Sequence, residues 1–429
     1  MKTRRGEKHP ETRKEKIIVL RNKRVLITGV SGFVGSHLAK YLLNEGANVF
    51  GLIRRRADGS IPQNIKYLGI ENDVTVLEGD ILDISSIASA LDQSKPDIIF
   101  HFAAQSLIPR SFSHPWETME ANCLGTANLL EAIRTQGLAP VVVFAGSSEE
   151  YGLAIFSASQ YQRIKSKYGT IFPAPTNIPE LPVTESNPLR PMSPYAVSKV
   201  YGDYLMRNYY IAYGLRTVVS RAFNCEGAGR GGVFVTSGIT HQVMQLKRGE
   251  IDRITIGNVN AFRDWSHIND ILKGYCLLAE KGRYGEVYNQ GSQRTNSVLS
   301  YVLLSLECAG YTIDRIETIN GNRVVQKPNE LDNSQMFGLC FEKTKVDRQM
   351  LEGKLDFQLS DIGIVAITDK GKITIQFDKE RFRLADVPIL LSETAKIQEL
   401  GFKINHSLRD IINDQLDYFS RPVSVTGQE

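Results

Sequence analysis

The sequence has few cysteines and no long apolar run. Its five cysteines are spread over residues 123–340 without a Cys-x-x-Cys pair, and their number is odd. This pattern excludes a regular disulfide framework and a cysteine-based zinc site, and it is typical of reduced thiols in a cytoplasm. No stretch reaches the roughly 18 apolar residues of a membrane span, and the N-terminal region lacks the apolar segment of a secretory signal. We therefore predict a cytoplasmic protein with no membrane partner and no metal.

The chain also carries little excess charge of either sign. It has 51 Lys and Arg residues against 47 Asp and Glu residues, a net charge of +4, and much of the excess lies near the N-terminus. A basic leader can bind nucleic acid or an anionic membrane, but a run of this size is more often a solvated tail. We predict that residues 1–22 are a disordered leader and that the protein has no nucleic-acid partner.

Short apolar strands that alternate with amphipathic helices make up the first half of the sequence. We expect strands at 24–28, 48–53, 74–77, 97–102, 140–145 and 217–221, and helices at 33–43, 84–93 and 114–135. This alternation predicts a parallel sheet with helices on both faces. The predicted fold class is α/β: a Rossmann-type doubly wound parallel sheet with a smaller α/β substrate-binding domain.

A length of 429 residues is enough for these two domains. We expect the Rossmann domain at 23–221, with a later segment near 254–292 that returns to it. The second domain is then formed by 222–253 and 293–420, where the regular alternation ends and several β-like runs occur late. Residues 153–182 contain four prolines and lie between two candidate catalytic motifs, so we expect an ordered loop or insertion beside the site.

A glycine turn joins the first strand to the first helix. Gly29, Gly32 and Gly35 allow the backbone to approach a pyrophosphate, whose charge the helix N-terminus can face. The strand before the turn and the helix after it favour a dinucleotide site over a merely structural turn. The further cofactor contacts that we predict are Phe33 and Val34 at the turn, Asp80 and Ile81 after the third strand, where Asp80 meets the adenine, and Ala103 and Ala104 after the fourth strand, on the nicotinamide side.

Arginines follow the second strand, about twenty residues after the glycine turn. NAD enzymes have an acidic residue there that binds the ribose 2′-hydroxyl, whereas this chain has Arg54, Arg55 and Arg56. Guanidinium groups suit a 2′-phosphate, so we predict NADP as the cofactor in preference to NAD. The alternative is that the arginines form a solvated loop or a subunit contact.

Tyr195 and Lys199 are four residues apart in a helical segment and therefore share a helix face. A phenol, with an ordinary pKa of ~10, acts as a base near neutral pH only when a cation stabilises its phenolate, and Lys199 supplies such a cation. The pair alone would fit a surface tyrosine and lysine on an ordinary helix. Together with the upstream glycine turn, it predicts the acid and base of a hydride-transfer enzyme.

A polar run with two acidic residues follows the fifth strand, at the sheet edge where α/β folds bind ligands. Ser147 and Ser148 offer hydroxyls that can hold a reacting oxygen, and Glu149 can remove a carbon-bound proton next to a ketone. We predict that all three are catalytic. The alternative is that Glu149 and Glu150 belong to a solvated turn.

These motifs together resemble the extended short-chain dehydrogenase/reductases that modify nucleotide-sugars, and most closely the GDP-mannose 4,6-dehydratases. The likeness covers about residues 23–420 and includes TGVSGFVGSHL, GLIRRR, SSEEYGL, SPYAVSK, FNCEGAGRGGVFVTSGIT, IGNVNAFRDWSHINDIL and FRLADVPILLSETAKIQELGFK. It implies that Glu149 is the catalytic glutamate, that Tyr195 and Lys199 are the Tyr/Lys pair, and that Ser147 replaces a threonine. The substrate-binding residues that it implies are Ser106, Asn224, Arg230, Val235, Arg263 and Arg383, although each arginine alone could be a surface residue.

The resemblance implies a lyase that converts a GDP-linked sugar into its 4-keto-6-deoxy form, and a homodimer or homotetramer. Three alternatives stay open at this point: a reductase of 4-keto-6-deoxy nucleotide-sugars, a nucleotide-sugar 4-epimerase, and a protein that binds nucleotide without turnover. The loop 153–182 is longer than the family usually has, and 326–380 matches only loosely. These two segments could change the sugar that is accepted.

Overall fold

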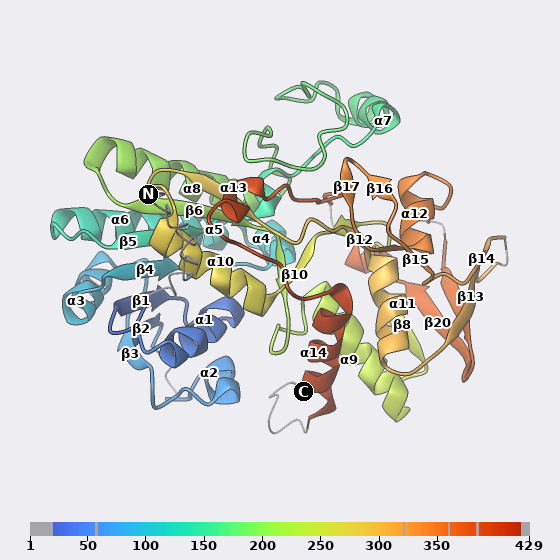
Figure 1. Cartoon of the computed structure of the whole chain (residues 1–429), viewed down its shortest axis with the longest axis horizontal. Coiled ribbons are helices and arrows are strands. Elements are labelled where there is room, and N and C mark those ends of the chain that lie inside the picture. Colours follow the sequence, from blue (N-terminus) through green and yellow to red (C-terminus); the bar gives the residue numbers. More distant parts are fainter. Residues whose placement is uncertain (1–19, 56–58, 321, 359–360, 383–385, 422–429) are drawn as a thin grey trace, which may run out of the picture.

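The structure is a computed structural model, and it describes residues 20–55, 59–320, 322–358, 361–382 and 386–421. Most of the predicted leader, Arg56 and Arg383 lie outside the described residues. The described chain forms two lobes, each built around a sheet, and the two sheets lie at opposite ends of the long axis (Figure 1).

A parallel sheet of seven strands forms the first lobe, in the order β11-β6-β5-β4-β1-β2-β3. Its strands are β1 (Arg24–Thr28), β2 (Asn48–Ile53), β3 (Thr75–Glu78), β4 (Ile98–His101), β5 (Val141–Ala145), β6 (Thr217–Ala222) and β11 (Val287–Gln290). The predicted strands all occur, with ends shifted by one residue at most. β11 lies within the segment that was expected to return to the first domain. The predicted fold class is confirmed.

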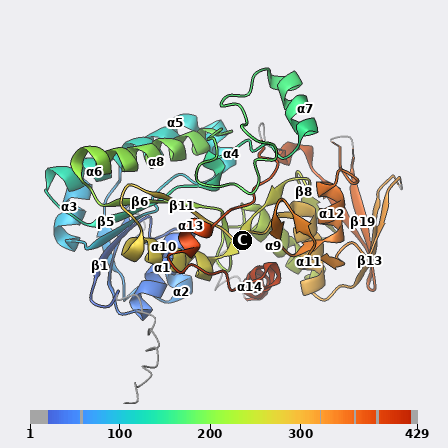
Figure 2. The ribbon, with the colours of Figure 1, turned by 45° about the horizontal axis from the view of Figure 1, so that its top comes forward.

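Helices cover both faces of this sheet, as the apolar strands require (Figures 1 and 2). Val25 and Ile27 of β1 pack in the same core as α1 (Phe33–Asn44) and α10 (Ile268–Lys281). Leu26 points to the opposite face, whose helices are α3 (Ile84–Ser94), α6 (Gly125–Thr135) and α8 (Pro194–Tyr213). The helix predicted at 114–135 is divided into α5 (Pro115–Met119), the π-helical turn η1 (Glu120–Leu124) and α6.

The second lobe has a sheet of five strands in the order β14-β13-β19-β20-β8. These strands are β8 (Arg253–Ile256), β13 (Ile313–Thr318), β14 (Val324–Gln326), β19 (Gly363–Thr368) and β20 (Gly371–Phe377). Four helices share its apolar core: α9 (Val235–Arg248), α11 (Val298–Cys308), α12 (Lys345–Leu351) and α14 (Leu408–Ser420). β8, at the start of the segment 254–292, pairs with this sheet, whereas α10 and β11 belong to the first lobe.

The insertion at 153–182 carries α7 (Ala158–Tyr168), which projects from the body of the molecule in both views (Figures 1 and 2). A buried ion pair holds the base of the insertion: Arg190 Nη1 and Nη2 each lie 2.7 Å from a carboxylate oxygen of Glu180. The N–H of Arg190 also donates to the carbonyl of Tyr151, directly after the predicted catalytic run. Leu181 of the insertion and Phe341 of the late region belong to one apolar cluster with Tyr151. The two segments that match the family least therefore pack together beside the predicted site.

Candidate active site

The glycine turn has the tight geometry that a dinucleotide requires. Gly29 has φ +73°, and a Cβ atom there would lie 2.7 Å from the backbone nitrogen of Ala103. A Cβ atom on Gly35 would lie 2.3 Å from the carbonyl oxygen of Gly29, so α1 starts directly against the end of β1. Gly32 is the N-cap of α1 and has no side chain to occupy the first N–H groups of the helix. These N–H groups can bind a phosphate, and the turn fits the predicted cofactor.

Hydrogen bonds hold the segment after β4 beside this turn. Thr28 Oγ1 lies 2.7 Å from His101 Nδ1 and accepts the N–H of Ala103 at 3.2 Å. Burial lowers the pKa of His101 to about 3, so its imidazole is neutral. Ala103 and Ala104 therefore follow β4 at the same sheet edge as Gly29, as predicted from their place in the sequence.

The predicted adenine and 2′-phosphate residues lie at the same edge. Asp80 accepts the N–H of Leu82 at 2.9 Å, and Ile81 packs against Gly125. Arg54 and Arg55 follow β2 with exposed side chains. Arg55 lies 3.9 Å from Glu78, and with 84% and 63% of these side chains exposed the contact is weak. Both guanidinium groups are thus available to an anionic ligand, and their role stays a prediction.

A single 3₁₀ turn after β5 carries the predicted catalytic run. In η2 (Ser148–Glu150) the N–H of Glu149 donates to Ser147 Oγ at 3.2 Å, and the N–H of Ser147 donates to Glu150 Oε1 at 2.7 Å. Only 8% of Glu149 and 0% of Glu150 is exposed. The alternative of a solvated turn is therefore wrong, because both acidic residues are buried.

Helix α8 presents Tyr195 and Lys199 to this turn. Ser193 caps the helix by accepting the N–H of Ala196 at 3.1 Å, which places Tyr195 in the first turn. The hydroxyl of Tyr195 hydrogen-bonds Ser147, and the charge of Glu149 is close enough to raise the pKa of Tyr195. Lys199 Nζ donates to the carbonyl of Ala145 at 2.7 Å. The serine, glutamate, tyrosine and lysine predicted to be catalytic are thus brought together.

The pKa of Tyr195 moves opposite to the direction that the Tyr/Lys pair alone predicts. Burial raises the pKa of Tyr195 to about 12, and burial lowers the pKa of Lys199 to about 8. The ammonium group binds Ala145 and lies 5.8 Å from the centre of the Tyr195 ring, so it does not compensate for the loss of water around the phenol. Tyr195 is a neutral phenol in this state.

The predicted substrate residues have different surroundings. The guanidinium of Arg230 lies 5.2 Å from the Phe33 ring centre and 3.6 Å from that of Phe234, and its charge lowers the pKa of Tyr195. Arg230 thus lies beside Phe33 at the start of α1, and its Nε is 3.6 Å from Glu226 Oε2. Asn224 Oδ1 is buried and accepts no hydrogen bond from the described residues.

Arg263 is anchored within the protein rather than turned to an open site. Its Nη2 lies 2.8 Å from Asp386 Oδ1, and its Nη1 donates to the carbonyls of Phe262 and Val387. A diphosphate would have to share this guanidinium with partners that it already has. Val235 is the first residue of α9, and Ser106 is exposed after β4.

Sequence reasoning missed two groups next to the site. Asn122, in the π-helical turn, donates to Ser198 Oγ at 2.8 Å and accepts the N–H of Gln105 at 2.8 Å, and so joins α8 to the loop after β4. Arg221 at the end of β6 binds both Glu150 and Asp203. An arginine that ends a buried strand and an aspartate four residues after Lys199 are signals that could have revealed the second group.

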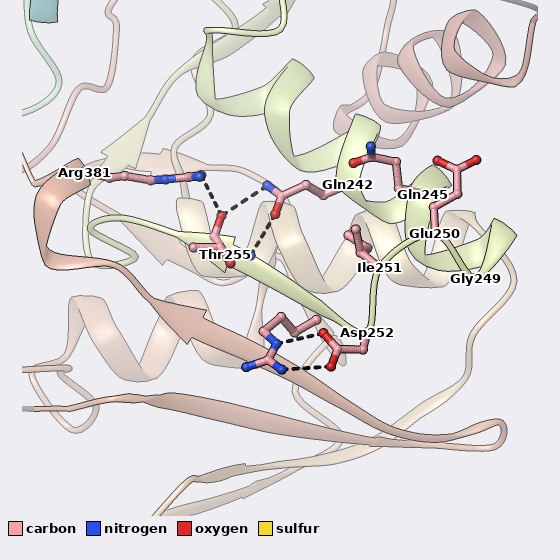
Figure 3. A pocket seen from close by; sticks show the side chains of 9 residues that line it. Gln242, Gln245, Gly249, Glu250, Ile251, Asp252, Thr255 and Arg381 are labelled. Carbon is pink, nitrogen blue, oxygen red and sulfur yellow. Dashed lines mark hydrogen bonds and ion pairs between the residues drawn. The ribbon is translucent and has the colours of Figure 1, made fainter. Parts of the chain in front are cut away.

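A hollow of about 710 Å³ lies elsewhere, between the end of α9 and β8 (Figure 3). Its polar groups satisfy one another: Gln242 exchanges two hydrogen bonds with the backbone of Thr255, and Arg381 donates to the same carbonyl. Among the described residues, none of those predicted for the site lines this hollow. The residues that the structure describes contain no helix able to cross a membrane and no cluster of three metal-binding side chains.

Known proteins resemble this chain in sequence and in fold. Residues 25–291 match the NAD dependent epimerase/dehydratase family. The GDP-mannose 4,6-dehydratase of Sinorhizobium fredii (strain HH103) is 30% identical over 408 residues, which cover 92% of this chain and 97% of that protein. A solved structure of RMD from Pseudomonas aeruginosa complexed with NADPH has a TM-score of 0.62 at 21% identity, covering 92% of this chain and 98% of the other. The UDP-glucose 4-epimerase of Thermus thermophilus, in complex with NAD, has a TM-score of 0.64 at 20% identity, covering 92% of this chain and 99% of the other.

The two solved structures support the fold alone, because their sequences are only 20–21% identical to this chain. The family match and the identity to the GDP-mannose 4,6-dehydratase establish the family. The predicted resemblance is confirmed: the chain belongs to the NAD dependent epimerase/dehydratase family.

Proposed function

We propose that this protein is an NADP-dependent nucleotide-sugar 4,6-dehydratase that acts on GDP-mannose or a closely related GDP-sugar. The observation that carries the proposal is the buried carboxylate of Glu149, which lies next to the hydrogen-bonded Ser147 and Tyr195. Tyr195 and Lys199 alone would serve any hydride-transfer enzyme. A carboxylate in the same site adds the base that an elimination needs, and GDP-mannose 4,6-dehydratases are the relatives at about 30% identity.

The residues divide the reaction between them. Tyr195 would take the proton of the sugar 4-hydroxyl as a phenolate, after its own phenolic proton has left for solvent. The positive charge of Arg230 favours this form because it lowers the pKa of Tyr195, and Lys199 completes the predicted pair with its Nζ 5.8 Å from the ring centre. The bound nicotinamide supplies the oxidant for C4 and later the reductant for C6, so no net redox equivalent is consumed. The resulting 4-ketone acidifies C5, and Glu149 removes the C5 proton. Water leaves from C6 when Glu149 or a serine hydroxyl protonates the departing oxygen.

The remaining predicted contacts belong to this proposal. The guanidinium groups of Arg230, Arg263 and Arg383 would bind the nucleotide diphosphate. The unpaired Oδ1 of Asn224 would accept a hydrogen bond from an N–H group of the base, and Ser106 and Val235 are the other predicted substrate contacts. A cytoplasmic location, a homodimer or homotetramer and the proposed domain boundaries stay predictions. Sedimentation of the pure protein tests the oligomeric state.

Incubation of the pure protein with GDP-mannose and catalytic NADP⁺ tests the reaction. We expect a product that is lighter by one water, with no net formation of NADPH, because the hydride returns to the sugar. Mass spectrometry and absorbance of the reduced nicotinamide measure both quantities. A need for stoichiometric NADPH, or turnover only of a pre-formed keto sugar, would instead identify the reductase. An unchanged mass with inverted C4 stereochemistry would identify the epimerase.

The choice of cofactor is tested by replacing the exposed arginines. We expect Arg54→Ala and Arg55→Ala each to weaken NADP binding about tenfold while NAD binding changes little, because only NADP has a 2′-phosphate for a charge-assisted hydrogen bond. Fluorescence titration with both reduced cofactors measures the dissociation constants. Arg253→Ala, in the second lobe, is the matched control. Equal affinity of the unaltered protein for NAD and NADP would contradict the prediction.

A further inference from the structure

Glu150 lies directly after Glu149, and its side chain contacts the backbone of the turn and the strand β6. Its carboxylate accepts the N–H of Ser147 at 2.7 Å and lies 3.1 Å from Arg221 Nε. No part of Glu150 is exposed, and only 3% of the Arg221 side chain is. The carboxylate thus connects the backbone of the catalytic turn to β6.

A second buried acid shares the same arginine. Asp203 Oδ2 lies 2.8 Å from Arg221 Nε, and Glu150 Oε2 lies 3.1 Å from the same atom, so the two carboxyl groups meet at one N–H group. Asp203 is fully buried and accepts a further hydrogen bond from Arg207 Nε at 2.7 Å. Among the described residues, Arg207 pairs with Asp203 alone, and Glu150 has only a share of Arg221 to offset its burial and the charge of Asp203, so the environment favours a neutral carboxyl at Glu150.

We propose that Glu150 and Asp203 share one proton, and that the neutral carboxyl of Glu150 is a positioning residue that holds Ser147, and with it Glu149, opposite Tyr195. The proposal rests on the proposed dehydratase function for its catalytic consequence. Its structural part, the shared proton and the fixed N–H of Ser147, does not depend on any substrate.

The surrounding charges set the direction of the titration. Burial and the charge of Asp203 raise the pKa of Glu150. When pH rises through that pKa, the second carboxyl ionises and the two acids repel each other. This repulsion opposes the preference of the Ser147 N–H for the ionised form, and it displaces the Glu150 carboxyl from Ser147. The charged and titratable groups that face the pair are Lys199 and Tyr195 on α8, Arg207 behind Asp203, Arg221 on β6, Tyr151 and Glu149 of the turn, and Glu185, which acts through Tyr151.

Infrared difference spectra between the unaltered protein and its variants test the shared proton. At neutral pH we expect a C=O stretching band of a protonated carboxyl that is absent in Glu150→Gln and in Asp203→Asn, because the one remaining carboxylate ionises beside Arg221. A band that persists in both variants, or no band in the unaltered protein, overturns the proposal. This measurement needs no substrate, so it stands even if GDP-mannose is not turned over.

A pair of substitutions at one position tests the positioning role. Glu150→Gln can still accept the Ser147 N–H and donate to Asp203, and the N–H of Arg221 Nε then belongs to Asp203 alone. We therefore expect near-normal kcat at pH 7, without the loss of activity at alkaline pH that ionisation of Glu150 causes. Glu150→Leu leaves the Ser147 N–H buried and unpaired, and we expect kcat to fall about tenfold or more with little change in KM. Hydrogen exchange of the Ser147 amide should be fast in Glu150→Leu and slow in Glu150→Gln.

The outcomes separate the two proposals. Dehydration by the unaltered protein together with full kcat and slow exchange in Glu150→Leu would refute the positioning role alone. Absence of dehydration together with the expected spectra and exchange rates would refute the proposed function alone. If Glu150→Leu does not fold, the spectra of Glu150→Gln and Asp203→Asn decide the proposal.

Discussion

Tyr195→Phe is expected to lower kcat for GDP-mannose dehydration about a thousandfold, while KM changes little. The substitution removes only the hydroxyl that exchanges the proton of the sugar 4-hydroxyl and that hydrogen-bonds Ser147. The ring stays in place, so α8 and the turn should keep their positions. Initial rates from product mass, at saturating and at low GDP-mannose, separate kcat from KM.

Tyr204→Phe is the matched control, because Tyr204 lies on the same helix with 55% of its surface exposed. This variant loses a hydroxyl in water and should keep full activity. If Tyr195→Phe retained a tenth of the activity or more, another group would have to carry the proton, and the role of Tyr195 would be wrong.

The features that the sequence predicts well are local ones. The glycine turn, the parallel strands and the Tyr/Lys spacing follow from glycine geometry, from short apolar runs and from the helical period, which involve neighbouring residues only. Residue 29 must lack a Cβ atom because Ala103 is close, but the glycine motif is visible in the sequence without knowledge of Ala103. The fold of the first lobe could therefore be predicted nearly strand by strand.

The features that the sequence does not predict depend on distant partners. Glu150 lies in a polar run that looks like a solvated turn in the sequence. Its burial depends on Arg221 of β6, which is 71 residues away along the chain, and on Asp203 of α8. The raised pKa of Tyr195 likewise comes from the protein around the phenol and not from the spacing to Lys199. Arg263 resembles a phosphate ligand in the sequence, yet Asp386 and two carbonyls already bind it.

Glu149→Gln is the second substitution with a large expected effect. We expect dehydration to fall about a thousandfold, because the amide cannot remove the C5 proton. Oxidation at C4 needs Tyr195 and Lys199 but not Glu149, so binding of the cofactor and formation of its reduced form in a single turnover should remain. Stopped-flow absorbance of the reduced nicotinamide, followed by mass analysis of the sugar, measures the two steps separately.

The separation of the two steps is what makes this prediction informative. A dehydratase that lacks its base should accumulate the 4-keto sugar and reduced cofactor, whereas a reductase or an epimerase would lose little, since neither reaction breaks the C5–H bond. Glu280→Gln, an exposed carboxylate on α10, controls for the change of charge. Dehydration at the normal rate in Glu149→Gln would assign the base to another residue. The Glu149 and Glu150 variants should slow different steps. Glu149→Gln blocks the elimination alone. Glu150→Leu slows every step that Ser147 and Tyr195 share, because Glu150 holds the backbone of Ser147.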